Sequence, residues 1–562
     1  MLVRGPLPAC ACGERRDRRA LLRTLKLHTG LLAVLCLYLV LVCHYFERVP
    51  HGWDQAEYAL CVKASYLPHS PYLLYFVAGK LLHLLFAPPV ALSVLSALSG
   101  VAALCLFYGS VVRVSAGAAG SAGRPDRGLA TAATALLGLA FAFVRQAATQ
   151  EVYVFQTALV LLSLFVLLGG GRWAVVWSGV AFGCAVGAHN SSLFLLPAMV
   201  VAAAGVSRGR RARALVLWLA AVVLVCGLWA AAVWLLVPAP GDGSRVGYVL
   251  GYLRGISPRV AHPAARAPGF LAYSVRDLWH RLFSLDVAMS RLPRASSPLG
   301  LSVLHLLAAA AGVVLWVREG GWRGAFWGLY PLPFLGYEVV LGRNLDYGLY
   351  VPFVLPPLCV LAALGVRWVG GLRRGGTWVS AALVVLLLLP SAVLHWRHWG
   401  SVVRDEAAHY SPTTLAAIWM ARHLPENAVV IQPKGELGPN LVAYYWASQH
   451  AYCTRDESIL FQSRGRFTPL NQTAFVPLTT DRLEGLIAAG RPVYAFEPAP
   501  LGRCDGRVID ASAFEWRRAA EVDLEAVAAD LGLRERVLRG LRVARLALYR
   551  GSVRRPTDDG RR

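Results

Sequence analysis

Residues 31 to 42 read LLAVLCLYLVLV, and comparable apolar runs recur through the sequence as far as Leu394. The 562-residue chain is 56% hydrophobic and 16% charged, and its mean hydropathy is positive. Apolar runs of this kind are typical of membrane spans rather than of the core of a soluble protein. The sequence therefore predicts an α-helical, polytopic integral membrane protein.

Membrane topology explains the basic charge of the chain. The net charge is +24, and most of the arginines in the apolar region stand between the apolar runs. In a soluble protein such a charge would indicate nucleic-acid binding, but between spans it marks cytoplasmic loops. We therefore expect a lipid bilayer, and no nucleic acid, as the partner. Richness in arginine, alanine, glycine and leucine is typical of a high-GC gene, which predicts a bacterial plasma (inner) membrane.

A basic segment precedes the first apolar run and sets its orientation. Residues 1–27 form a polar tail rich in arginine, and no clear cleavage site of the small-x-small type follows Val42. The positive-inside rule then predicts a retained first span with a cytoplasmic N-terminus. Further spans are expected near residues 89–112, 128–144, 152–169, 173–188, 190–206, 214–237, 300–317, 325–341, 349–366 and 377–394.

The distribution of arginines supports this set of spans. Arginine clusters follow alternate spans and fall on the cytoplasmic side, provided that the segment from Tyr72 to Ala87 does not cross. Lys80 and His83 interrupt that segment, which is typical of a helix lying at the outer interface. The prediction is then a transmembrane domain of about eleven helices at residues 28–394.

An odd number of spans places the C-terminal region outside the cytoplasm. Outer loops are expected at residues 47–88 and 238–299. Residues 395–549 alternate helical and strand-like patterns, which predicts a small extracytoplasmic α/β domain. A disordered tail is expected at 550–562.

Local patterns predict individual elements of this C-terminal domain. Helices are expected at 413–424, 441–448 and 481–489, and strands at 428–432 and 492–496. Cys453 and Cys504 also lie in this domain. Outside the cytoplasm the two thiols could form a disulfide, or both could stay free.

The segment after the first span carries two of the few acidic residues of the membrane domain. Residues 51–58 read HGWDQAEY, and only ten acidic residues, Asp54 included, occur from Asp54 to Trp399. A carboxylate near hydrocarbon is costly unless it has a use. Asp54 and Glu57 are therefore candidate catalytic residues, since a partly desolvated carboxylate can accept a proton from a hydroxyl or bind a divalent cation. Alternatively, the pair only caps or solvates the loop.

Further polar residues are predicted at the same outer face, at the ends of other spans. The candidate substrate-binding residues are Lys63, His69, Arg145, Glu151, Tyr153, His189, Asn190, Arg343 and Asp346. Arg343 suits a lipid phosphate, because a guanidinium group binds phosphate with two hydrogen bonds. Arg145 and Glu151 could instead form a boundary ion pair, and His189 could be a structural histidine of its turn.

The order of these motifs resembles a known family. An Asp-x-x-Glu spacing in the first outer loop is followed by LPHSPY (67–72), QEVY (150–153), AHN (188–190), and Asp346 before YVP (350–352). This order resembles the membrane-embedded glycosyltransferases of superfamily C, and among them the bacterial relatives of the animal transmembrane protein O-mannosyltransferases. The resemblance covers residues 28–394 and extends weakly into 412–460.

The resemblance implies a polyprenyl-phosphate sugar donor, a protein or glycan acceptor, catalysis in an outer cavity and inversion at the sugar carbon. It implies Asp54 as general base, with Glu57 assisting or orienting the donor or a divalent cation. Two alternatives stay open. A transporter or lipid-linked sugar flippase predicts ionisable residues near the bilayer midplane and repeat symmetry, and a non-enzymatic assembly protein would tolerate the loss of Asp54.

Overall fold

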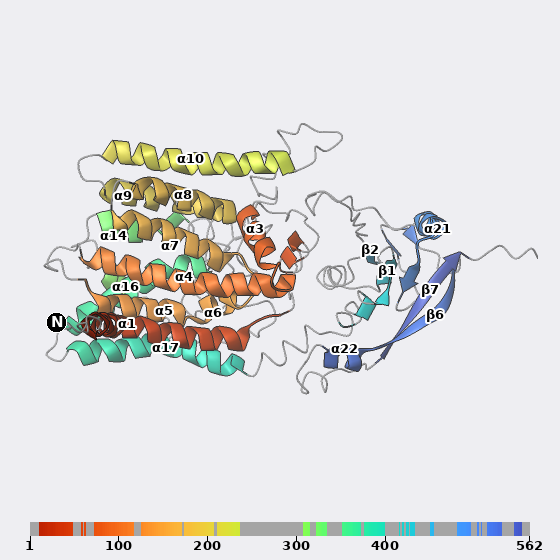
Figure 1. Ribbon diagram of the computed structural model, residues 1–562, viewed down its shortest axis with the longest axis horizontal. Helices are drawn as coiled ribbons and strands as arrows, with labels where there is room; N and C mark the ends of the chain where they lie inside the picture. The colour runs from red at the N-terminus through yellow and green to blue at the C-terminus, as the bar shows by residue number, and fades with distance from the viewer. Residues whose placement is uncertain are drawn as a thin grey trace, which may run out of the picture.

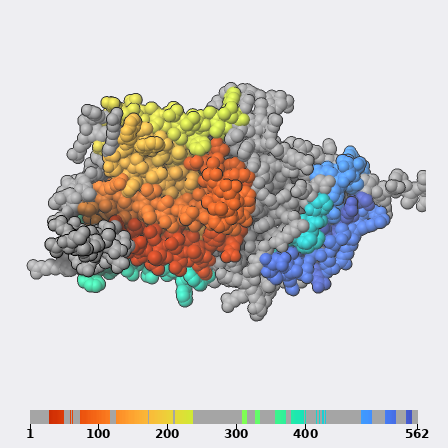
Figure 2. Space-filling view, in the orientation of Figure 1, coloured from red at the N-terminus to blue at the C-terminus, as the bar shows by residue number. Residues whose placement is uncertain are grey.

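The computed structural model describes most of the helical part of the chain and pieces of the C-terminal domain. In the helical part it describes residues 11–48, 55, 58–59, 61–62, 72–116, 125–170, 173–206, 211–236, 307–314, 322–333, 351–371 and 376–399. Further on, it describes residues 415, 419–420, 423–425, 428–432, 450–453, 480–495, 503–504, 507–508, 514–530 and 545–553. Figure 1 shows a bundle of long, roughly parallel helices with a sheet beyond one of its ends. Figure 2 shows the helical bundle and the C-terminal domain in space-filling form.

The bundle is built from apolar helices. In chain order they are α1 (Ala11–Tyr45), α3 (Leu73–Leu82), α4 (Pro88–Ala116), α5 (Arg127–Gly138), α6 (Phe141–Ala147), α7 (Tyr153–Gly169), α8 (Ala174–Ala188), the 3₁₀ helix η1 (Asn190–Leu195), α9 (Leu196–Val206), α10 (Arg211–Leu236), α14 (Trp322–Leu329), α16 (Val351–Gly371) and α17 (Gly376–Trp399). Among the described residues, four helices are long and apolar enough to cross a membrane, and the bent pair α5–α6 makes a fifth if it is one span. The chain is an integral, multi-pass membrane protein. Parts of the spans expected at 300–317 and 325–341 lie outside the described residues, so the total of about eleven stays a prediction.

The span expected at 128–144 is not a single helix. The axes of α5 and α6 meet at 64°, because α5 ends at Gly138 and α6 begins only at Phe141. A break in a buried helix exposes backbone groups that need other partners. One of them, the carbonyl of Leu139, lies 3.3 Å from Nε2 of His395 on α17, which donates to it in the matching tautomer. A side chain far away in the sequence therefore stabilises the bend.

Helix α3 lies at the end of the bundle that faces the sheet and is inclined to the long helices (Figure 1). It has ten residues, which corresponds to about 15 Å of helix, whereas the hydrocarbon core is about 30 Å thick. Tyr75 is buried against the bundle, while Leu81, Leu84 and Leu85 are exposed. This short helix cannot cross the membrane alone and suits the interfacial position expected from the sequence.

Close packing of α8 against α10 fixes the turn that follows α8. Gly179 and Gly183 of α8 face α10, and a Cβ atom on Gly179 would lie only 2.6 Å from the carbonyl oxygen of Trp218. Small residues allow membrane helices to approach in this way. The end of α8 is thereby held at a defined place in the bundle.

The C-terminal region contains a mixed five-stranded sheet with the order β2-β1-β3-β7-β6. Its elements, with two further strands and two helices, are β1 (Val429–Gln432), β2 (His450–Cys453), α21 (Thr480–Ala488), β3 (Val493–Ala495), β4 (Arg503–Cys504), β5 (Arg507–Val508), β6 (Phe514–Asp523), α22 (Leu524–Asp530) and β7 (Arg545–Val553). Strand β1 is parallel to β2 and β3, and β7 is antiparallel to β3 and β6. The predicted elements at 428–432, 481–489 and 492–496 are confirmed as β1, α21 and β3.

Three strands of this sheet, β2, β6 and β7, were not predicted. Strands β6 and β7 carry arginine and glutamate between their apolar residues, so that a buried face is hard to recognise in the sequence. Strand β7 also continues to Val553, past the expected end of the domain at residue 549, because Arg550 and Gly551 pair with β3 and β6. The helix expected at 441–448 and the side chains of Cys453 and Cys504 lie outside the described residues.

Candidate functional site

Polar side chains from distant parts of the sequence meet at the end of the bundle that faces the sheet. Glu47 follows α1, Gln150 and Glu151 lie between α6 and α7, and His189 lies between α8 and η1. All four are buried, with at most 6% of their surface exposed. Buried polar groups require partners, and each of the four side chains has an ion pair or a hydrogen bond here.

Glu47 is bound to three neighbouring segments. One oxygen of its carboxylate lies 3.5 Å from the guanidinium of Arg145 on α6, and its backbone N–H donates to the carbonyl of Ala148 at 3.0 Å. Its own carbonyl accepts hydrogen bonds from Ser93 at 2.7 Å and from Gln150 at 3.1 Å, and Gln150 also donates to Ser93 at 2.8 Å. The chain just after α1 is thereby fixed against α4 and the α6–α7 turn.

Burial dominates the electrostatics of this ion pair. Desolvation raises the pKa of Glu47 from 4.5 to about 8, and the attraction of Arg145 offsets only part of the rise. The guanidinium of Arg145 also lies over the ring of Tyr45, 5.0 Å from its centroid. Arg145 is thus part of a boundary ion pair, as one interpretation of the sequence proposed, but the partner is Glu47 and not Glu151.

Glu151 binds the segment between the first span and α3. Nε2 of Gln55 donates to its carboxylate at 3.3 Å, and both side chains are buried. Ser96 donates to the backbone carbonyl of Glu151 at 3.0 Å, and the hydroxyl of Tyr75 lies 3.3 Å from that of Ser96. Gln55 follows Asp54 in the sequence. The α6–α7 turn therefore holds the residue next to the proposed base.

His189 stabilises its own turn. Its Nδ1 accepts the backbone N–H of Ser191 at 3.1 Å at the start of η1, and its ring stacks on Tyr72 at 4.7 Å between centroids and lies 5.3 Å from the ring of Tyr153. Burial lowers its pKa from 6.5 to about 3, so the imidazole is neutral at neutral pH. These contacts favour the structural interpretation of His189 and connect the turn to the segment before α3.

The structure brings five of the predicted binding residues to this end of the bundle: Arg145, Glu151, Tyr153, His189 and Asn190. Tyr153 begins α7 and Asn190 begins η1, so each lies beside a turn of the network. The remaining predicted site residues lie outside the described residues: Asp54, Glu57, Lys63, His69, Arg343 and Asp346. Their roles stay predictions.

Several buried polar residues at this end of the bundle were not identified from the sequence. Glu47 follows the first apolar run directly and precedes Arg48, a pattern typical of a solvated interfacial charge pair. His395 and His398 lie in the last turns of α17, where Nδ1 of His395 is 3.3 Å from the hydroxyl of Tyr45 and the ring of His398 is 5.1 Å from that of Phe141. The position of these two histidines, close to the end of the last apolar run, could have indicated that they belong to the site. Within the described part of the chain, no group of three or more metal-ligating side chains comes together.

The chemistry available to the described residues is mainly positioning. Arg145 and Glu151 are each engaged by a neighbouring side chain, and the ring of His189 is neutral and stacked. Such contacts hold Gln55 and Tyr72, which stand on either side of Glu57, Lys63 and His69 in the sequence. A preorganised support of this kind is what a catalytic carboxylate at the membrane surface requires.

Comparison with known proteins gave structural matches only. The sequence matches no protein-family model and no curated protein. Among solved structures, the chain is similar to ArnT from Cupriavidus metallidurans bound to undecaprenyl phosphate, with 12% identity and a TM-score of 0.49 over 93% of this chain and 98% of that chain. It is similar to the oligosaccharyltransferase AglB from Archaeoglobus fulgidus in complex with an inhibitory peptide and a dolichol-phosphate, with 11% identity and a TM-score of 0.48 over 83% and 69%.

A third structure is the Archaeoglobus fulgidus oligosaccharyltransferase tethered with an acceptor peptide that contains the NVT sequon. It has 12% identity and a TM-score of 0.46 over 76% of this chain, and the match spans 64% of that chain, less than two thirds of its length. All three are similarities in structure at low sequence identity.

Proposed function

We propose that the protein is an integral membrane glycosyltransferase that moves a sugar from a polyprenyl-phosphate donor to a protein or glycan acceptor outside the cytoplasm. The observation that carries this proposal is the buried hydrogen bond of 3.3 Å between Gln55 and Glu151. It attaches the residue after Asp54 to the end of the bundle where Glu47 and Arg145 also meet. A general base must be held in position to abstract a proton, and the anchored neighbour Gln55 supports that role for Asp54.

The distribution of charge favours an enzyme over a transporter. In the described spans, which are His28–Tyr45, Pro88–Ser115, Arg211–Leu235 and Trp378–Trp396, the charged side chains lie in a first or last turn: Arg113, Arg211 and Arg213. A transporter or flippase would place ionisable residues near the bilayer midplane. The buried charges of Glu47, Arg145 and Glu151 lie instead at one end of the bundle, which the positive-inside rule assigns to the outer face.

In the proposed reaction, a hydroxyl oxygen of the acceptor attacks the anomeric carbon of the donor sugar. The bond from that carbon to the phosphate oxygen breaks, the lipid phosphate leaves, and Asp54 takes the proton of the hydroxyl. Glu57 assists Asp54 or orients the donor, while Lys63, His69 and Arg343 bind the phosphate. Attack opposite the leaving group inverts the sugar carbon.

The other candidate residues support this reaction indirectly. Glu151 holds the Gln55 segment, and Arg145 fixes the chain after α1 through Glu47. Tyr153 and Asn190 begin the helices on either side of the His189 contacts. In this proposal these residues keep the outer cavity in shape, and Asp346 beside Arg343 orients that arginine.

The test is sugar transfer by the full-length protein in reconstituted membranes. A panel of polyprenyl-phosphate sugars is offered, with mannose first because of the resemblance to O-mannosyltransferases, and with and without a chelator of divalent cations. Asp54→Asn should lower the transfer rate by about 10²–10⁴-fold, the usual contribution of a general base. The matched control is Asp126→Asn at the other end of the bundle, where asparagine caps a helix as well as aspartate does.

Three outcomes would contradict parts of the proposal. Full transfer by Asp54→Asn would remove this residue as the base. Loss of transfer in Asp126→Asn to the same extent would mean that the effect is not specific to the outer end. Flipping of the lipid-linked sugar across the bilayer without transfer from any donor would favour the transporter.

A further inference from the structure

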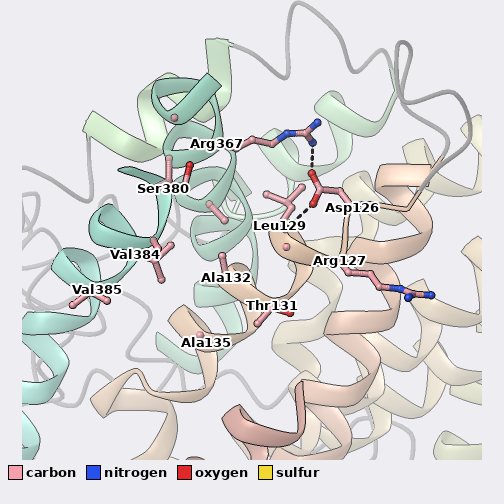
Figure 3. Close-up of a pocket in the computed structure, with 15 residues that line it drawn as sticks. Asp126, Arg127, Leu129, Thr131, Ala132, Ala135, Arg367, Ser380, Val384 and Val385 are labelled. Carbon is pink, nitrogen blue, oxygen red and sulfur yellow. Dashed lines mark hydrogen bonds and ion pairs between the residues drawn. The ribbon is translucent and has the colours of Figure 1, made fainter. Parts of the chain in front are cut away.

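A groove lies at the opposite end of the bundle from the polar network. It runs between α5, α16 and α17 and encloses about 970 Å³ (Figure 3). That volume is at the upper end of the range of roughly 300–1,000 Å³ that is typical of sites for small organic molecules. Most of its lining side chains are small or aliphatic, such as Leu129, Ala132 and Val384, and Thr131 and Ser380 add two hydroxyl groups.

An ion pair stands at the mouth of this groove. Nη1 of Arg367 lies 2.6 Å from Oδ2 of Asp126, and Oδ1 of Asp126 accepts the backbone N–H of Leu129 at 2.9 Å as the N-cap of α5. Both carboxylate oxygens are therefore engaged, whereas 58% of the Arg367 side chain is exposed. Figure 3 shows the side chain of Arg127 turned away from Arg367. Arg367 retains N–H donors for a further partner, since a guanidinium group has five.

The position of the groove indicates the medium that surrounds it. Its mouth is formed by the start of α5, the end of α16 and the start of α17, next to arginine-rich segments that the positive-inside rule assigns to the cytoplasmic face. The mouth is then at the level of the lipid headgroups, and the walls extend into the hydrocarbon. Val385 of the wall is 67% exposed, so the groove borders the bilayer. A mostly apolar wall offers water few hydrogen-bond partners, and the adjoining bilayer supplies acyl chains to fill the groove.

We infer that the groove binds an anionic glycerophospholipid, with acyl chain between α5, α16 and α17 and the phosphate on Arg367. Charge-assisted hydrogen bonds from a guanidinium group suit a phosphate. The surplus of arginine at this face favours an anionic over a zwitterionic headgroup. This site is independent of the proposed sugar-transfer site, which lies at the other end of the bundle.

The test is lipid binding by the purified full-length protein in mild detergent. Native mass spectrometry measures retention of phosphatidylglycerol and of phosphatidylcholine with the same acyl chains, and thermal unfolding is followed with and without each lipid. Ala132→Phe fills the groove, and its control is Ala220→Phe on the exposed face of α10. Arg367→Gln removes the headgroup contact, and its control is Arg211→Gln at the exposed start of α10.

The wild type should retain one phosphatidylglycerol and unfold at a higher temperature in its presence. Ala132→Phe should lose both effects, and Arg367→Gln should bind phosphatidylglycerol about tenfold more weakly, the usual effect of losing a hydrogen bond to a charged group. Both controls should behave as the wild type does. Unchanged binding by Ala132→Phe, or equal effects of Arg367→Gln and Arg211→Gln, would overturn the inference. So would a dimer that Ala132→Phe abolishes, because a second copy would then occupy the groove.

Discussion

The two ends of the bundle each carry an ion pair, and the two pairs differ in burial. Glu47 and Arg145 lie 3.5 Å apart with side chains 5% and 11% exposed, whereas Asp126 and Arg367 lie 2.6 Å apart with side chains 27% and 58% exposed. Exposed pairs are screened by solvent and contribute about 0–1 kcal/mol. Breaking a buried pair is far more costly, because one charge stays buried without compensation. The longer of the two pairs is thus the one on which the fold depends.

The surroundings of the two pairs extend this contrast. At the Glu47 end, hydrogen bonds from Ser93, Gln150 and Gln55 connect several turns. At the Asp126 end, aliphatic walls leave a groove with a polar mouth. The first arrangement fixes loops in one geometry, and the second leaves room for a lipid. The same helices therefore serve a positioning role at one end and a binding role at the other.

Arg145→Ala should have the largest effect on stability. Above pH 8, where Glu47 is ionised in the folded protein, the substitution leaves a buried carboxylate without its ion-pair partner, and the free energy of unfolding should fall by about 3–5 kcal/mol. Equilibrium unfolding in detergent measures this loss. The double variant Arg145→Ala with Glu47→Gln should recover a large part of it, because no uncompensated charge remains. Equal stabilities of the single and double variants would show that the charge of Glu47 is not what the arginine compensates.

The buried pair should also make the stability of the protein depend on pH, because Glu47 has a raised pKa. Its pKa is raised from 4.5 to about 8 by burial, so between these values the folded protein binds a proton that the unfolded chain has released. Stability should therefore fall as the pH rises through this window, and Glu47→Gln should remove that fall. His189 acts in the opposite direction and at lower pH, since its pKa is lowered from 6.5 to about 3 and stability falls as the pH drops below 6.5. Unfolding temperatures across pH measure both effects, and an unchanged profile in Glu47→Gln would contradict the first.

Arg367→Ala should have the smallest effect. In detergent without added phospholipid, the free energy of unfolding should change by less than about 1 kcal/mol, because the pair is exposed. The same unfolding experiment as for Arg145→Ala gives the comparison directly. A loss as large as that of Arg145→Ala would mean that the short distance, and not burial, decides the strength of these pairs.

Much of the architecture could be predicted from the sequence. Apolar runs indicated the membrane helices, and local periodicity indicated β1, α21 and β3, because these signals depend only on neighbouring residues. The bend between α5 and α6 could not be predicted, since the carbonyl of Leu139 bonds His395, more than two hundred positions away. Strands β6 and β7 were missed because their charged residues hide the buried face.

The candidate site was predicted only in part, because the sequence shows where polar residues stand but not which of them meet. The sequence identified Arg145, Glu151 and His189 as polar residues at span ends, and the positive-inside rule put them on one face. It did not identify Glu47 as the partner of Arg145 or Gln55 as the partner of Glu151. Pairing depends on which turns meet in space, and periodicity carries no such information.

The sequence by itself determined a multi-pass membrane protein with arginine on alternate loops and acidic residues near span ends, because hydropathy and charge act locally on each segment. Only the tertiary structure decided which of those charges are buried, which partner each has, and where a groove remains. The physical reason is that burial depends on how the helices pack. An arginine side chain is therefore a buried, stabilising group at position 145, whereas at position 367 it is exposed and can bind an anion.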